Sequence, residues 1–241
     1  PRPKPDFTYK LKILLGFIQI LTNLSIGLDI QWPSMFVKFL SLFNFANFDF
    51  LQLAGFSCVA DTNYWWKLVA WGASPLILII SLTLFYLLPA YIRNPGIGGT
   101  ERDMIRKRTQ RKKAKRNFWK LCLFTLFLIY PSVSSTMIRT FVCREVEGTW
   151  YLQSDFQILC YQGAWNTWAP LAAGLIILYP IGIPCLFFSM VYSRKRKNRL
   201  DEYGVRSEVG FLYDAYERSA WWFEMADMLH KLIVTSLIAF L

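Results

Sequence analysis

Four apolar stretches, each close to the length of a bilayer crossing, constrain this chain more than any other feature. They cover about 13–30, 65–88, 118–138 and 168–192, and a fifth covers 226–241 up to the end of the sequence. A helix needs about 20 apolar residues to cross a hydrocarbon core of ~30 Å. The sequence therefore predicts four complete transmembrane helices and a truncated fifth, in a piece of a longer protein.

The composition supports the same class. Apolar residues make up 54% of the 241 residues and charged residues only 18%, against roughly 25% charged residues in a soluble domain. A single soluble core of this size could not bury so much apolar surface. Lipid requires internally bonded backbone, and alternating strands do not recur here. The predicted fold class is therefore an all-α, polytopic transmembrane bundle.

The positive charges alternate between successive connections. The N-terminal flank, 93–117 and 194–224 are rich in Lys and Arg, whereas 31–64 and 140–166 contain few cations. Cytoplasmic connections of membrane proteins carry the excess of Lys and Arg. We therefore expect a basic cytoplasmic loop at 93–117, a cytoplasmic linker with an amphipathic helix at 194–224, and two outer segments.

The cations of 93–117 are candidates for contact with anionic lipid headgroups. The predicted set is Arg106, Lys107, Arg108, Arg111, Lys112 and Lys113. Anionic lipid attracts such a cluster with about 1 kcal/mol per cation. A role as topology determinant alone explains the same residues. A nucleic-acid patch is the weaker alternative, because the segment lies between two spans, and we expect no nucleic-acid partner.

The two outer segments contain short elements of their own. Pro33 and Ser34 are typical of a helix start, and the apolar residues that follow predict an interfacial helix or a re-entrant element. Cys143 and Cys160 flank a predicted β-hairpin that turns near Gly148. The oxidising side favours a Cys143–Cys160 disulfide. Cys58 lies in the first outer segment and could pair with either cysteine, so the sequence leaves the pairing open.

Ionisable and polar groups gather at two places in the apolar stretches. Glu224, Asp227 and Lys231 share one face of the fifth span, with His230 beside them. Gln19 and Asn23 share a face of the first span with two glycines. These six residues are candidates for an ion pathway or gate. Helix packing is the favoured explanation of the first-span face. A cytoplasmic interface with Glu224–Lys231 or Asp227–Lys231 pairs explains the fifth-span face equally.

Prolines interrupt the third and fourth spans. Pro131, Pro180 and Pro184 are candidate hinges, because proline frees a backbone carbonyl and broken helices are frequent in channels and transporters. Pro75 in the second span is interpreted as a plain kink. No catalytic or metal-binding motif is present, so we expect neither enzyme activity nor a cofactor.

Five segments together resemble a known family. They are 11–20, 48–58, 130–143, 179–184 and 221–231. In this order they resemble the membrane domain of large cell-surface multipass proteins of algae and other protists, which have cysteine-rich, EGF-like or ephrin-receptor-like ectodomains. That domain is similar to fungal TRP-like and polycystin-related channel proteins. The resemblance implies an upstream ectodomain and downstream spans, and it assigns no pore residues.

Two functions follow as hypotheses, with a third of lower weight. The first is a TRP/polycystin-like ion-channel domain in the plasma membrane, at the cell surface or on a cilium or flagellum. The alternative is a non-conducting anchor or scaffold that holds an ectodomain or an extracellular appendage. The third is an integral-membrane transferase that uses His230 with Glu224 or Asp227. Expected partners are the lipid bilayer with its anionic lipids, further copies or homologous subunits, and an extracellular structural protein.

Overall fold

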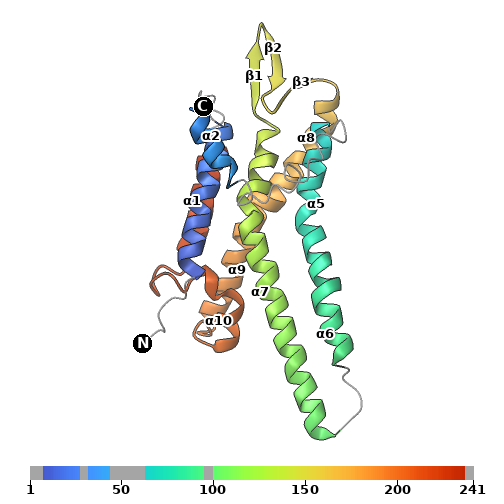
Figure 1. The fold of residues 1–241 in the computed structure, drawn as a ribbon, viewed down its shortest axis with the longest axis vertical. Helices are drawn as coiled ribbons and strands as arrows, with labels where there is room; N and C mark the ends of the chain where they lie inside the picture. The colour runs from blue at the N-terminus through green and yellow to red at the C-terminus, as the bar shows by residue number, and fades with distance from the viewer. Residues whose placement is uncertain (1–7, 28–31, 44–62, 95–99, 237–241) are drawn as a thin grey trace.

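The computed structural model describes residues 8–27, 32–43, 63–94 and 100–236, and these are mostly helical (Figure 1). The helices are α1 (Thr8–Gly27), α2 (Ser34–Ser41), α5 (Tyr64–Leu82), α6 (Leu88–Arg93), α7 (Glu101–Arg139), α8 (Ala164–Ile176), α9 (Gly182–Arg196), α10 (Tyr203–Val209) and α11 (Phe223–Ser236). Two π-helical turns, η2 (Thr83–Leu87) and η3 (Ile177–Ile181), and a 3-10 turn, η4 (Gly210–Leu212), complete the helical elements.

Three of these helices are long and apolar enough to cross a bilayer. They are Tyr64–Arg93, Glu101–Arg139 and Ala164–Arg196, with 30, 39 and 33 residues. They coincide with the second, third and fourth predicted spans. Each π-turn is absorbed within a continuous helix, so α5, η2 and α6 form one helix and α8, η3 and α9 form another.

The first and fifth predicted spans form shorter helices within the described residues. In α1 the apolar stretch covers Ile13–Thr22, which is about 15 Å of helix at 1.5 Å per residue. Residues 28–30 of the first predicted span and 237–241 of the fifth lie outside the described residues. Membrane crossing by α1 and α11 stays a prediction.

The long elements run alternately up and down (Figure 1). The basic residues at the start of α1, in the first half of α7 and at the end of α9 lie in the lower part of the molecule in Figure 1. The small sheet and α2 lie at the other end. The arrangement therefore separates the basic connections from the cation-poor ones, as the alternation of charge predicts.

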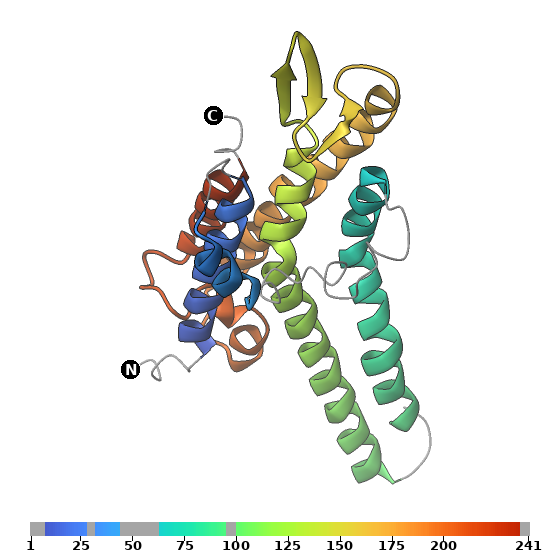
Figure 2. The same cartoon turned by 45° about the horizontal axis from the view of Figure 1, so that its top comes forward.

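Helix α7 lies between the other elements. Figures 1 and 2 show α1 and α11 on one side of α7 and the α5–α6 helix on the other. Of the most apolar 18-residue stretch in each helix, 67% is buried in α7 but only 6% in the α5–α6 helix. Tyr130, Val133 and Met137 of α7 are almost wholly buried, and Phe187 of α9 packs in the same core. The α5–α6 helix therefore presents most of its apolar surface outward.

The structure differs from the sequence prediction over 93–117. Instead of a loop, Glu101–Arg116 forms the first half of α7, so the basic segment continues directly into the apolar helix. The segment consists largely of Arg, Lys and Gln, which favour helices. A capping box between Thr100 and Asp103 begins the helix, and the bonds from Thr100 lower the pKa of Asp103. The 39 residues extend for about 58 Å.

The predicted hairpin and disulfide are confirmed, with one more strand. Strands β1 (Cys143–Val146) and β2 (Thr149–Leu152) pair antiparallel, and Glu147 and Gly148 between them both have positive φ, as a two-residue type I′ turn requires. β3 (Asp155–Leu159) extends the sheet to the order β1-β2-β3. A Cys143–Cys160 disulfide closes it. The pairing of β2 with β3 is irregular, because Tyr151 lies opposite Leu159 and Leu152 opposite Asp155.

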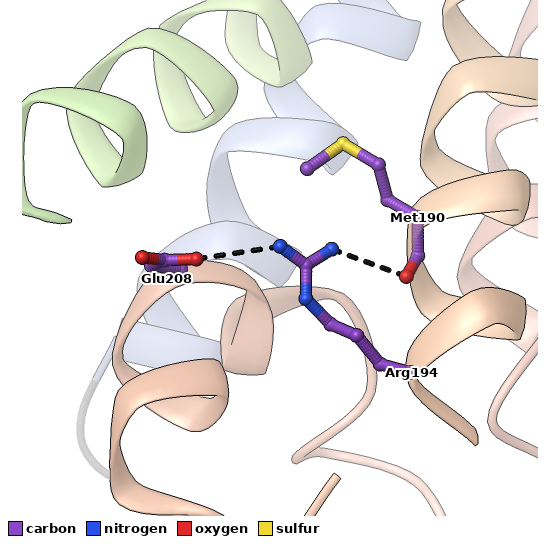
Figure 3. A network of polar contacts seen from close by, with 3 residues as sticks. All are labelled: Met190, Arg194 and Glu208. Atoms are coloured by element: carbon purple, nitrogen blue, oxygen red, sulfur yellow. Dashed lines mark hydrogen bonds and ion pairs between the residues drawn. The ribbon is translucent and has the colours of Figure 1, made fainter. Parts of the chain in front are cut away.

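Ion pairs organise the linker between α9 and α11. Arg194 of α9 donates to the Met190 carbonyl at 3.1 Å and to Glu208 of α10 at 3.3 Å (Figure 3). Arg206 pairs with Asp214 at 2.9 Å, and this bond raises the pKa of Arg206. The linker therefore folds back against the basic end of α9.

Candidate functional site at the junction of α1, α7 and α11

Two charged residues of α11, Glu224 and Lys231, are buried inside the protein. The side chain of Glu224 is wholly buried, and the Tyr216 hydroxyl donates to its Oε2 at 3.0 Å. Burial, together with the Glu224 carboxylate, raises the pKa of Tyr216, so the phenol remains a hydrogen-bond donor at neutral pH. Tyr216 precedes α11 and was not predicted as a site residue, because no periodicity links it to the helical face.

Lys231 lies about two turns further along α11, where the helix contacts α1 and α7. Its Nζ is 2.7 Å from Oδ2 of Asp227, and only 9% of the residue is exposed. Its ammonium group also lies 5.7 Å from the centroid of the Phe127 ring of α7, within cation–π range. The predicted Asp227–Lys231 pair is therefore present. It is i, i+4 within α11, so it forms without any change in helix packing.

Gly16 of α1 makes room for Lys231. A Cβ atom built at Gly16 would lie 2.8 Å from the Lys231 Nζ and 3.1 Å from its Cε. Both distances are shorter than ordinary van der Waals contact. The absent side chain thus allows α1 and α11 to pack closely around a buried ammonium group.

Gln19, one turn further along α1, binds the backbone of α7. Its Nε2 donates to the Leu128 carbonyl at 2.9 Å, and the side chain is buried. The carbonyl just before it, that of Phe127, is the one that Pro131 leaves without an N–H partner four residues later. The space between Gln19, Pro131 and Lys231 that is open to the centre of a water molecule is about 10 Å³, roughly enough for one water.

Side chains donate to carbonyls that two other prolines leave without an N–H partner. Pro184 cannot donate to the Pro180 carbonyl, and the Tyr130 hydroxyl of α7 donates to it at 3.2 Å. Pro75 likewise leaves the Trp71 carbonyl without an N–H partner, and Ser74 Oγ of the same helix donates to this carbonyl at 2.8 Å. The next carbonyl, that of Gly72, accepts from Tyr179 of η3. These bonds link α1, α7, η3 and α5 across the bundle.

The remaining predicted site residues are not part of this junction. His230 is exposed, whereas Glu224 is wholly buried, so the two side chains do not share one environment. The side chain of Asn23 and the whole of Cys58 lie outside the described residues. Within the part of the chain that the structure describes, no group of three or more His, Cys, Asp or Glu could hold a metal ion.

The basic half of α7 is attached to the end of α6. Arg111 donates from Nε to the Asn94 carbonyl and from Nη2 to the Tyr91 carbonyl at 3.3 Å. Its guanidinium carbon also lies 5.0 Å from the centroid of the Tyr91 ring. Arg111 thus satisfies carbonyls at the C-terminus of α6, where a helix lacks partners of its own.

The fold and this junction define a helical chain with three apolar helices of bilayer-spanning length, a disulfide-closed sheet at one end and buried ionic groups between helices. Comparisons with protein-family models, with curated proteins and with solved structures give no match. The function proposed below therefore rests on the geometry of the chain's own residues.

Proposed function

We propose that this chain is the membrane domain of a cell-surface protein, with its basic segments in the cytoplasm. The three long apolar helices, the outward apolar surface of α5–α6 and the gathering of the basic connections at one end support this orientation. The disulfide at the other end fits an oxidising, extracellular side. The proposed location is the plasma membrane.

Within that membrane domain, we propose a non-conducting anchor that holds an ectodomain or an extracellular appendage. The observation that carries this is that Glu224 and Lys231 are buried among packed helices and that Tyr216 and Asp227 bond to them. Tyr216 donates a hydrogen bond to Glu224, and Lys231 forms an ion pair with Asp227. The cavity beside Lys231 has a volume of only about 10 Å³. A hydrated ion route needs charges that face continuous water, whereas paired groups in a close-packed junction stabilise helix contacts.

Reconstitution tests this function. The intact protein, purified and placed in liposomes, is expected to give no cation flux under voltage or membrane stretch, with gramicidin as the positive control for the assay. Alkaline carbonate should leave the protein in the membrane pellet, because its apolar helices are integral. A cation conductance that Asp227→Asn abolishes and Gln157→Asn on the outer sheet leaves unchanged would contradict the anchor.

The TRP/polycystin-like channel, which was the first hypothesis from the sequence, is the second candidate here, and one observation favours it. The α8–η3–α9 helix changes from α- to π-hydrogen bonding at Ile177–Ile181, next to Pro180 and Pro184, and π-turns often occur at functional sites. A hinge there could change the angle between α8 and α9. The same flux assay separates the two candidates, since a channel predicts conductance that depends on this segment.

A further inference from the structure

We propose that an anionic phospholipid binds along one side of the α6–α7 pair, with its phosphate at Lys112 and Lys115. Its acyl chains would lie along the outward apolar face of α6 and the preceding turns. This inference rests on the proposed membrane function, and it assigns a particular binding site in place of a general attraction between a basic segment and the membrane.

The height of the site is fixed by Arg111. Because Arg111 bonds to the carbonyls of Tyr91 and Asn94, the end of α6 is level with the middle of the basic half of α7. Figures 1 and 2 show these two parts side by side at the lower end of the molecule. Apolar residues of one helix therefore lie at the same height as lysines of the other.

Helix geometry places those residues on one side of the pair. Each residue turns a helix by about 100°, and equal steps along two antiparallel neighbours turn toward the same side of their common plane. Lys112 directly follows Arg111, and Ile92 directly follows Tyr91. Both therefore lie on the same side of the α6–α7 pair.

Further residues of each helix fall on this side. On α7 the spacing of four, three and four residues forms one stripe, composed of Arg108, Lys112, Lys115 and Trp119. On α6, Leu88 and Ile92 are four residues apart and share a face. The two stripes make a surface that is cationic along α7 and apolar along α6, which we call the amphiphilic face.

The amphiphilic face is open and its charges are available. Ile92 is 68% exposed and Leu88 48%. Lys112 and Lys115 are exposed, and neither makes an ion pair or hydrogen bond to any described residue. Trp119 is 46% exposed, one turn nearer the apolar half of α7, and tryptophan favours the boundary between headgroups and hydrocarbon.

Charge and polarity together identify the ligand. Water suits the lysines but not Leu88 and Ile92, and hydrocarbon suits the leucine and isoleucine but not the lysines. An anionic phospholipid satisfies both at once, because its phosphate binds ammonium groups and its chains cover apolar side chains. Of the six cations predicted to contact lipid headgroups, only some therefore lie on the amphiphilic face. Arg111 is occupied by α6, and Arg106 and Lys113 turn to the opposite side of α7.

The test compares two double variants with the same change in net charge. The intact protein in detergent micelles is titrated with brominated-chain phosphatidylserine or phosphatidylcholine, and quenching of tryptophan fluorescence is measured. The difference signal between the protein and its Trp119→Phe variant isolates the tryptophan on the amphiphilic face. Lys112→Gln/Lys115→Gln removes the proposed headgroup contacts, and Lys113→Gln/Lys120→Gln removes two cations from the opposite side.

We expect phosphatidylserine to bind more tightly than phosphatidylcholine. Lys112→Gln/Lys115→Gln should weaken phosphatidylserine binding roughly tenfold or more, because each cation near an anionic lipid contributes about a factor of five. The control double variant should change the affinity for phosphatidylserine by less than about threefold. Supporting results include a loss of Trp119 quenching in the first variant alone.

Three results would overturn the site. They are equal weakening by both double variants, no preference for phosphatidylserine, and binding of an acidic amphipathic peptide to the amphiphilic face in preference to lipid. Failure of the membrane function itself is recognised separately. If the membrane function is wrong, alkaline carbonate releases the protein from membranes. If the protein stays in the membrane pellet but shows no preference for phosphatidylserine, only the proposed lipid site is wrong.

Discussion

Lys231 illustrates how single residues decide the packing of this chain. A buried ammonium group is costly unless it is paired, and here Asp227 supplies the carboxylate while Gly16 supplies the space. The sequence places Asp227 and Lys231 on one helical face. It does not show that Gly16, more than 200 positions away, is the residue against which Lys231 packs.

Substitution of Gly16 tests this contact. The nearest atoms belong to the flexible end of Lys231, so Gly16→Ala should change stability by less than about 1 kcal/mol, since the gain in helix propensity offsets a small shift. Gly16→Leu should destabilise the protein by about 1–3 kcal/mol, because it overpacks the junction. The measurement is unfolding in detergent micelles.

Gly174 provides the matched control for that experiment. It lies within α8, and nothing is within 4 Å of a Cβ atom built there. Gly174→Leu should therefore leave stability nearly unchanged. If Gly174→Leu destabilises the protein as much as Gly16→Leu, the close approach of α1 and α11 has no special energetic role.

At the scale of elements, hydrogen bonds from tyrosines connect helices at or beside carbonyls that prolines leave without a partner. A proline in a helix leaves a carbonyl without its N–H partner, and in lipid that carbonyl must find another donor. Tyr130 binds the Pro180 carbonyl, and Tyr179 binds the Gly72 carbonyl. The predicted hinge positions Pro180 and Pro184 thus coincide with a π-turn and with an interhelical hydrogen bond.

A double-mutant cycle separates these effects. Tyr130→Phe removes the donor and should cost about 0.5–1.5 kcal/mol of stability. In the background of Pro184→Ala the same change should cost less, because the new N–H at position 184 can bind the Pro180 carbonyl itself. Unfolding in detergent micelles measures both differences.

Tyr192→Phe is the control for the cycle, because Tyr192 is exposed on α9. It should leave stability within about 0.5 kcal/mol, as for other surface substitutions. An identical cost of Tyr130→Phe with and without Pro184 would mean that the tyrosine does not compensate for the proline.

At the scale of the whole molecule, the up-and-down order of the helices brings the positively charged segments toward one end. The basic N-terminal half of α7 and the basic end of α9 lie toward one end, and the disulfide-closed sheet lies at the other. The same end-to-end difference follows from the positive-inside rule. The orientation that we propose in the membrane therefore depends on the complete arrangement of the helices.

Labelling of two matched glutamines tests the orientation. Gln157→Cys on β3 and Gln110→Cys on α7 both replace exposed residues, and a membrane-impermeant thiol reagent is applied to whole cells. Position 157 should react in intact cells and position 110 only after permeabilisation. The unsubstituted protein gives the background from its own cysteines. Labelling of both positions in intact cells would contradict the proposed crossing between them.

The local elements could be predicted from the sequence because their causes are local. Apolar length predicts the three long helices, and Gly148 between two short strands predicts the hairpin. The Asp227–Lys231 pair follows from i, i+4 spacing within one helix. The prediction of a loop at 93–117 is wrong over Glu101–Arg116, because the helix propensity of Arg and Lys extends α7 through the basic segment.

The sequence by itself determined the class of chain, the positions of its apolar helices and the cation-rich segments, since these depend on residues that are near in sequence or on bulk polarity. The pairing of Cys143 with Cys160, which the sequence left open, was decided by the structure. Only the tertiary structure decided that Gly16 receives Lys231, that Tyr216 bonds Glu224, and that Arg111 joins α7 to α6. These contacts depend on which helix faces meet. Periodicity fixes the faces of each helix, but packing in three dimensions selects their partners.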